Sequence, residues 1–278
     1  MSEFRTAAFV GRMQHVKTTD ITPPFPGRVL SLLLDAPSRW ERILLLVGVV
    51  LMTALAWAYL IHLDHQMPFA MEHDGMTAAT GTTSHTPWSA ADFLFTFVMW
   101  AVMMAGMMTP AAAPVLILFA VVRRGRAEPN ASPATLIFGL GYLAVWTGFS
   151  GVAAFTQWML HEAAMVSTRM AASSSYLAAA ILIGVGIYEL TPLKSRCLTH
   201  CRSPLAFLLA NWKTGKLGAF QMGIRHGIYC LGCCWALMCV LFVVGAMNLV
   251  WIAALTVYVL IQRVGPAGAL VTWGASTN

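Results

Sequence analysis

Long apolar runs separated by polar connections dominate the chain and predict a helical membrane protein. About 20 apolar residues in a helix cross the hydrocarbon core of a bilayer. We expect spans near residues 43–61, 93–122, 136–160, 177–190, 228–246 and 249–262. The predicted fold class is therefore all-α, a polytopic membrane helix bundle of about six transmembrane helices. The second run is long enough to tilt or break, and Pro110 and Pro114 favour a break.

Basic residues are distributed by connection, which predicts the orientation of the bundle. Lys and Arg gather before the first span and after the second and fourth, whereas Arg169 is the only one in the connections expected on the other side. Because cytoplasmic loops carry the excess of basic residues, we expect both termini inside. The chain then divides into a cytoplasmic N-terminal tail (1–40), a membrane-embedded helical domain (41–264) and a cytoplasmic C-terminal tail (265–278).

The composition supports this picture and excludes two other classes. Apolar residues make up 58% of the chain and charged residues 10%, whereas about a quarter of an ordinary soluble domain is charged. The net charge of +6 does not indicate nucleic-acid binding, because the basic residues follow the loops rather than one face. The N-terminal segment begins without an early apolar run, so we expect no cleaved signal peptide.

The connection after the first span is rich in groups that bind metals. It contains His62, His65 and His73 together with carboxylates and methionines, and imidazole with thioether suits copper. These three histidines are accessory candidates, because a polar loop that happens to hold histidines explains them equally well.

Five methionines lie close together in the second span. They are Met99, Met103, Met104, Met107 and Met108. Spacings of four place three of them on one stripe with the other two beside it. Neutral thioethers bind soft ions such as Cu(I) without burying a charge on the protein. The alternative is that methionine merely fills irregular helix contacts.

Thiols cluster in two separate stretches of the chain. The metal-capable residues are Cys197, His200 and Cys201 after the fourth span, and Cys230, Cys233 and Cys234 in the fifth. The last three share one helical face, and both stretches are expected near the cytoplasmic boundary. Thiolates bind Cu(I) and Zn(II), so the sequence predicts a copper site and leaves zinc open. Buried structural cysteine is the alternative, and it accounts readily for Cys239.

Two ionisable residues adjoin this predicted site. Glu189, at the end of the fourth span, is an accessory ligand candidate or the ion-pair partner of Lys194 or Arg196. We expect His226, at the entry to the fifth span, to be an interfacial anchor rather than a ligand.

Three motifs carry a family resemblance over roughly residues 93–262. They are MWAVMMAGMMTPAAAP in the second span, YELTPLKSRCLTHCRSP after the fourth, and GIYCLGCCWALM in the fifth. With them the chain resembles a bacterial family of predicted metal-binding integral membrane proteins, a domain of unknown function whose members are sometimes labelled copper chaperones. The resemblance implies metal binding through the five clustered cysteines and a multi-pass location in the bacterial cytoplasmic (inner) membrane.

The residues and the resemblance favour a membrane protein that handles Cu(I), as a chaperone or a transport relay. Its expected partners are the lipid bilayer and a soluble copper carrier or a copper-requiring membrane enzyme, with no nucleic acid. A membrane thiol–disulfide protein, or an assembly subunit of a larger complex, remains an alternative. No phosphate-binding glycine loop is present, and no nucleophile–base arrangement stands out, so we predict no enzyme activity.

Overall fold

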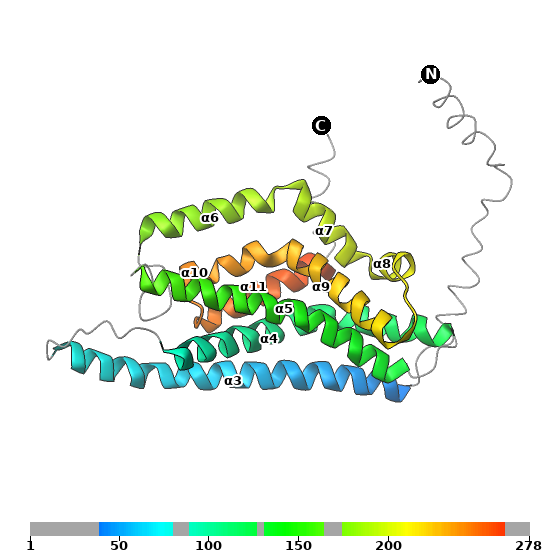
Figure 1. The fold of residues 1–278 in the computed structure, drawn as a ribbon, viewed down its shortest axis with the longest axis horizontal. Coiled ribbons are helices and arrows are strands. Elements are labelled where there is room, and N and C mark those ends of the chain that lie inside the picture. Colours follow the sequence, from blue (N-terminus) through cyan, green and yellow to red (C-terminus); the bar gives the residue numbers. More distant parts are fainter. Residues whose placement is uncertain (1–38, 80–88, 127–130, 164–173, 265–278) are drawn as a thin grey trace, which may run out of the picture.

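The computed structural model describes residues 39–79, 89–126, 131–163 and 174–264, and within these ranges the secondary structure is helical, without strands (Figure 1). The helices are α3 (Arg39–Ala79), α4 (Ala90–Gly125), α5 (Ala131–Glu162), α6 (Ser175–Glu189), α7 (Pro192–Arg202), α8 (Pro204–Ala210), α9 (Gly215–Cys239), α10 (Leu241–Val244) and α11 (Leu249–Val264). The predicted all-α bundle is confirmed. Most of the two predicted tails lies outside the described residues.

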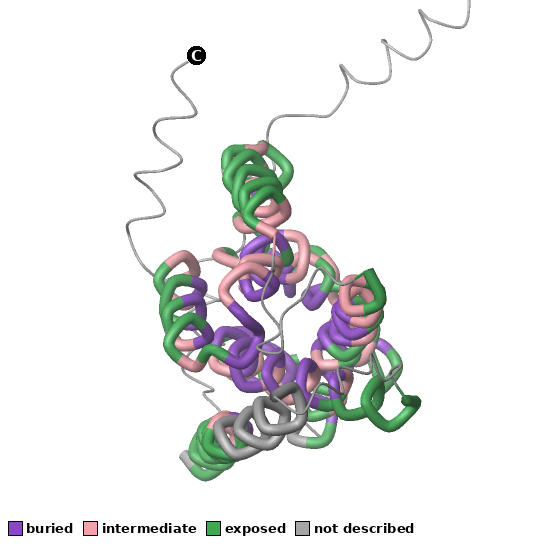
Figure 2. The backbone as a smooth tube through the Cα atoms, turned by 90° about the vertical axis from the view of Figure 1, so that its left-hand side faces the viewer, coloured by how far each residue is buried: buried purple, intermediate pink, exposed green. Residues whose placement is uncertain are grey.

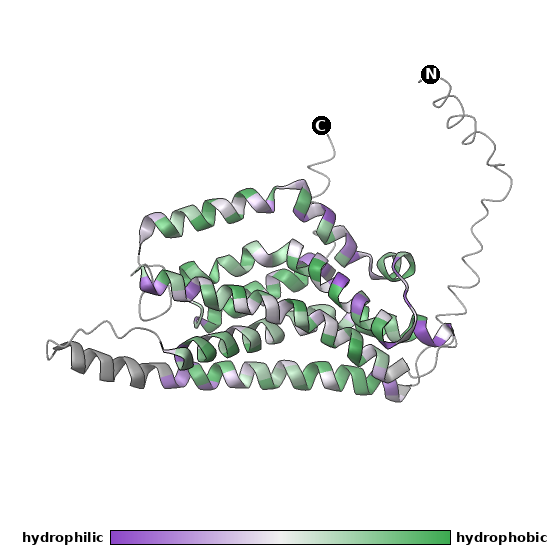
Figure 3. Ribbon diagram, viewed as in Figure 1, coloured by the Kyte–Doolittle hydropathy of each residue, from purple (hydrophilic) through white to green (hydrophobic). Residues whose placement is uncertain are grey.

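Four helical stretches in the described part of the chain are long and apolar enough to cross a membrane. They are Trp40–Gln66, Ala90–Gly125, Pro133–Glu162 and Gly215–Val244. A fifth crossing results if α6 and α7, which meet at a bend of 62°, are taken as one broken span. The last predicted span corresponds to the shorter apolar helix Leu249–Arg263. Apolar positions lie along the helices and hydrophilic ones mostly towards their ends (Figure 3).

Helices α3 and α4 differ from the expected elements in length and continuity. Helix α3 continues to Ala79, through most of what the sequence predicts to be a loop. Helix α4 is one continuous helix despite Pro110 and Pro114. Its first turn is closed by a capping box in which the Ser89 hydroxyl accepts from the Asp92 N–H and the Asp92 carboxylate accepts from the Ser89 N–H.

The tightest helix contact joins α5 and α9 through glycines. A Cβ added to Gly223 would lie 2.0 Å from the Phe138 carbonyl oxygen, and one added to Gly141 would lie 2.3 Å from the Phe220 carbonyl oxygen. Only glycine fits at such close backbone approaches. In a membrane, close packing of this kind replaces the hydrophobic effect that joins helices in water.

Helix α9 begins much earlier than the predicted span. It starts at Gly215 rather than near residue 228, so Cys230 lies about 22 Å along the helix at 1.5 Å per residue. Gly215–Val244 is the helical stretch that contains the candidate span, and Cys230 is near the middle of that stretch. The first turns of α9 contain Lys216, Gln221 and Arg225, so the apolar pattern does not mark them as part of the helix. The expected position of the thiols near the cytoplasmic boundary stays a prediction.

Helix α8 closes one end of the bundle, where α4 ends and α9 begins. Phe207 and Leu208 of α8 are buried, and Trp212, just after α8, stacks on Phe119 of α4. The guanidinium of Arg126 lies 4.8 Å from the Trp212 ring centroid. We call this the basic end, since Arg123, Arg124, Lys213 and Lys216 also lie there.

The buried positions face the interior of the bundle (Figure 2).

Candidate metal site

Two thiols from separate helices meet inside the bundle. The Cys201 Sγ of α7 lies 3.9 Å from the Cys233 Sγ of α9. This is too far for a disulfide, whose sulfurs are about 2.05 Å apart. Metal–sulfur bonds of about 2.3 Å allow two sulfurs on one ion to be separated by up to about 4.6 Å. The pair therefore has a separation that a single soft ion can bridge.

The break between α6 and α7 brings these thiols to α9. Helix α7 starts with Thr191 as its N-cap, whose hydroxyl accepts from the Lys194 N–H, and with Pro192 at its first position. Both features favour a new helix start at this point. The 62° bend directs α7 against α9, where Cys197 fits over Gly232: a Cβ on that glycine would lie 2.8 Å from the Cys197 Sγ.

The three cysteines of α9 form a compact buried group. Cys230, Cys233 and Cys234 are each at most 2% exposed. The thiols of Cys233 and Cys234 both donate to the Cys230 carbonyl oxygen, at 3.0 and 2.8 Å. The predicted convergence of the two thiol stretches is thus present for Cys201 and Cys233, with Cys197 and Cys230 immediately beside them.

Arg263 of α11 provides a positive charge to this group. Its Nη2 donates to the Cys230 Sγ and lies 3.8 Å from the Cys233 Sγ, while Nη1 donates to the Ala111 carbonyl oxygen of α4 at 3.3 Å. Arg263 directly follows the last predicted span (249–262), and the structure places its guanidinium among the thiols. A neighbouring cation stabilises thiolates, which are the forms of cysteine that bind metals.

The methionine stripe lies next to the thiols. The Tyr142 hydroxyl of α5 is 3.2 Å from the Met108 carbonyl oxygen and 3.0 Å from the Cys230 Sγ. One phenol therefore connects the end of the stripe to the thiol group. All five predicted methionines, Met99, Met103, Met104, Met107 and Met108, are fully buried at 0% exposure. Burial fits both packing and binding, so their role as ligands stays a prediction.

A family model described as copper chaperone, PpoB2, matches residues 97–277. The chain belongs to this family. The match spans all three motifs that carry the resemblance, and it includes all the cysteines, the five methionines of the stripe and Arg263. No curated protein and no solved structure matches this chain.

Within the described residues of this copper chaperone family member, no group of three or more His, Cys, Asp or Glu side chains is arranged to hold a metal ion. The thiols therefore offer a two-sulfur contact with further sulfurs nearby, rather than a closed three- or four-residue site. Low coordination by soft sulfur is compatible with Cu(I), whereas structural zinc sites are almost always tetrahedral with four ligands.

His200 does not join the thiol group. Its ring stacks on Tyr229 at 4.3 Å between centroids, its Nδ1 lies 2.9 Å from the Arg196 carbonyl oxygen, and it is exposed. The predicted accessory histidines His62 and His65 do not join the thiol group either. Both are exposed on α3, where the His62 Nε2 lies 3.0 Å from the Gln66 side-chain nitrogen. The side chain of His73 lies outside the described residues.

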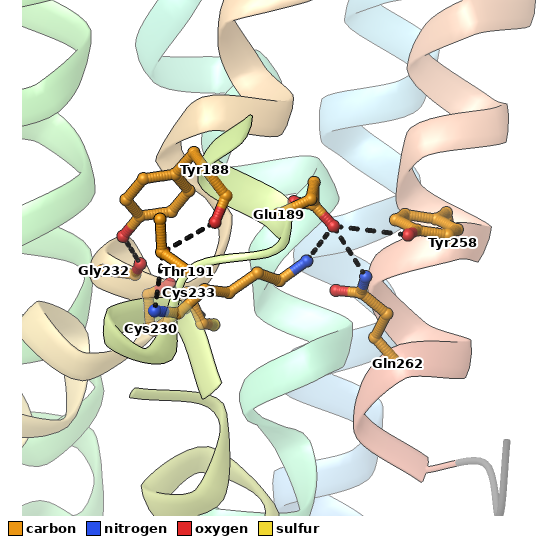
Figure 4. Close-up of polar contacts among 9 residues, drawn as sticks. Tyr188, Glu189, Thr191, Cys230, Gly232, Cys233, Tyr258 and Gln262 are labelled. Atoms are coloured by element: carbon orange, nitrogen blue, oxygen red, sulfur yellow. Dashed lines mark hydrogen bonds and ion pairs between the residues drawn. The ribbon is translucent and has the colours of Figure 1, made fainter. Parts of the chain in front are cut away.

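Glu189 occupies a polar cluster at the helix break (Figure 4). Its Oε2 forms an ion pair with the buried Lys194 and accepts from the Tyr258 hydroxyl at 3.4 Å and the Gln262 amide at 3.5 Å. The Lys194 partner is one that the sequence suggests. The cluster connects the α6–α7 break to α11 through hydrogen bonds. Because Arg263 follows Gln262 directly, these contacts help to position its guanidinium beside the thiols.

Sequence reasoning missed three residues at this site. Arg263 sits at the end of an apolar run and looks like a topology marker, and nothing near Tyr142 in the sequence indicates a thiol contact. His226 is only 2% exposed, so the expectation that it is an interfacial anchor is wrong. His226 lies four residues before Cys230, and this spacing could have indicated that the two side chains share one face of the helix.

Proposed function

We propose that this member of the copper chaperone family binds Cu(I) within the membrane between Cys201 and Cys233 and passes it to a partner. The observation that carries the proposal is the 3.9 Å separation of these two sulfurs, which come from stretches of chain that are 32 residues apart. Thiolate ligands select soft ions. The guanidinium of Arg263 beside the thiols balances part of the negative charge that two thiolates and one Cu(I) carry together.

The methionine stripe gives the ion a route to the thiols. Met99 to Met107 covers roughly 12 Å of helix axis at 1.5 Å per residue, and Tyr142 links the Met108 turn to Cys230. We place the basic end in the cytoplasm of a bacterium, following the distribution of Lys and Arg. The ion then moves from thioethers to thiolates, and a soluble carrier or a copper-requiring membrane enzyme is its partner. The role is one of binding and transfer, without catalysis.

A thiol–disulfide function fits the same pair less well. A redox pair must be reached by the thiol of a partner. Of this pair Cys201 is half-buried and Cys233 is only 2% exposed, and the neighbouring Cys230 and Cys234 are buried as well. Small ions reach such positions more easily than another protein does. The burial of the trio therefore favours metal binding over thiol exchange.

The test compares two variants of the detergent-purified full chain loaded anaerobically with Cu(I). Cys201→Ser combined with Cys233→Ser removes the proposed pair, and Cys239→Ser removes a half-buried thiol of the same helix that lies outside it. Loss of an outer-shell partner alone costs about 10–100-fold in metal affinity, so the double variant should lose at least as much. Cys239→Ser should bind like the wild type.

Elemental analysis and competition with a chromogenic Cu(I) chelator measure the outcome. Equal copper retention in the double variant and in Cys239→Ser contradicts the proposal. A thiol count that drops by two on mild oxidation without any copper binding would favour the thiol–disulfide function instead.

A further inference from the structure

His226 is a buried imidazole, and one of its ring nitrogens makes no hydrogen bond within the described residues. It is 2% exposed, and its Nδ1 has no hydrogen-bond partner among the residues that the structure describes. Buried polar atoms are nearly always paired, and an unpaired one calls for an explanation such as a bound ion. Neutral imidazole is the commonest metal ligand in proteins.

The surroundings of His226 are aromatic. Its ring lies 6.2 Å from the ring of Phe138, 5.8 Å from that of Tyr142 and 5.3 Å from that of Phe207. The first two belong to α5 and the third to α8, which covers the basic end. Tyr142 also contacts the Cys230 Sγ at 3.0 Å. The imidazole and this thiol therefore lie against the same phenol.

The spacing of His226 and Cys230 suits a chelate on one helix. Residues four apart on a helix are neighbours, with about 5–6 Å between their Cβ atoms. Two histidines at this spacing bind one zinc ion in helices with the H-E-x-x-H pattern. On these grounds, and building on the proposed function, we infer that His226 and Cys230 form a second soft-metal subsite, one turn nearer the basic end than the Cys201–Cys233 pair.

The same face of α9 continues beyond this subsite. Met222, one further turn towards the basic end, is 1% exposed, and its Sδ lies 3.3 Å from the Lys213 backbone nitrogen in the α8–α9 connection. Met222, His226, Cys230 and Cys234 thus follow one another at steps of four residues. An ion that leaves the thiol pair for the basic end meets this mixed nitrogen–sulfur subsite next.

A variant background isolates the second subsite. In the full chain carrying Cys201→Ser and Cys233→Ser, anaerobic loading with Cu(I) leaves His226 and Cys230 as the proposed imidazole and thiolate donors, beside the thioethers of the methionine stripe. Copper X-ray absorption should then show one nitrogen of an imidazole together with sulfur. Absence of imidazole scattering in copper bound to this background overturns the inference.

Two substitutions of similar size then separate a ligand role from a packing role. In the same background, His226→Leu removes the donor and His226→Met restores a soft one in nearly the same volume. We expect His226→Leu to weaken Cu(I) binding by at least about tenfold, and His226→Met to retain it with sulfur-only coordination. Unchanged binding in His226→Leu, or equal losses in the two variants, overturns the inference.

This design keeps the two proposals apart. If copper binding were the same in the wild type and in the Cys201→Ser, Cys233→Ser background, the proposed thiol pair would fail, while the comparison of His226→Leu with His226→Met would still decide on His226. Conversely, copper lost completely from the background would support the thiol pair and contradict the second subsite. Size-exclusion elution of each variant confirms that it is folded.

Discussion

Helices α3 and α4 are both long and apolar, yet they have different places in the bundle. Over the apolar stretch that makes each helix a candidate span, 56% of the residues are buried in α4 but only 11% in α3. Helix α9 resembles α4 with 56%, whereas α6 has no buried residue. Among the four candidate spans, the buried methionines and the α9 thiols thus belong to the two most enclosed helices.

This contrast shows that hydropathy does not separate central from peripheral helices in a membrane. Lipid tails are as apolar as leucine, so burial against another helix gains little from the hydrophobic effect. Central helices are marked instead by small residues and by polar or soft side chains that need partners. In α9, Gly223, Gly227, His226 and the three cysteines are such residues, whereas the large exposed apolar side chains of α3 are mostly leucine and valine.

The largest effect on stability is expected where the enclosed helix α9 touches α5. Gly223→Ala would place a Cβ 2.0 Å from the Phe138 carbonyl oxygen, whereas Gly184→Ala in α6 would meet nothing within 4 Å. Overpacking costs about 1–3 kcal/mol, occasionally more, and a backbone oxygen yields less than a side chain does. We expect Gly223→Ala to reach about 3 kcal/mol or to prevent folding.

The peripheral control should behave in the opposite way. Alanine is better than glycine in a helix by about 0.5–1 kcal/mol, so Gly184→Ala should be neutral or slightly stabilising. Thermal unfolding in detergent, followed by circular dichroism, compares the two variants. Equal unfolding midpoints would show that the α5–α9 contact is not the close packing described here.

A second, smaller effect concerns the charge beside the thiols. Arg263→Gln removes the donor to the Cys230 Sγ, so two thiolates with bound Cu(I) would keep an unbalanced negative charge. We expect Cu(I) affinity to fall by about 10–100-fold, the range for loss of an outer-shell partner. Arg263→Lys should lose less, because it keeps the charge.

The matched control is Arg225→Gln, which removes an exposed arginine of α9 and should leave copper binding unchanged. Competition with a chromogenic Cu(I) chelator measures all three variants. Tighter binding in Arg263→Gln would mean that the guanidinium repels the ion more than it stabilises the thiolates.

The sequence predicts the local features of this molecule and one long-range approach, that of the two thiol stretches, but not the contacts of the last helix. Apolar runs and residue spacing predict the helices, and the step of three and four residues predicts the common face of Cys230, Cys233 and Cys234. The approach of Arg263 to these thiols depends on how α11 packs, and nothing within its own segment encodes that. The predicted start of α9 is too late because its first turns contain lysine, glycine and arginine, which interrupt the apolar pattern.

The methionine stripe gives the smallest expected structural effect and tests the same contrast between helices. Exchange of leucine and methionine nearly conserves volume and usually costs less than about 1.5 kcal/mol, so Met103→Leu with Met107→Leu should leave thermal unfolding close to that of the wild type. If the thioethers bind the ion on its way to the thiols, the same double variant should take up Cu(I) more slowly and hold fewer ions per chain. Met52→Leu in α3, a peripheral methionine, should change neither quantity. Unchanged copper uptake in the double variant would mean that the stripe serves packing alone. The methionines of α4 would then be explained by their flexible side chains, which fill the interior of the bundle, and not by metal binding through sulfur.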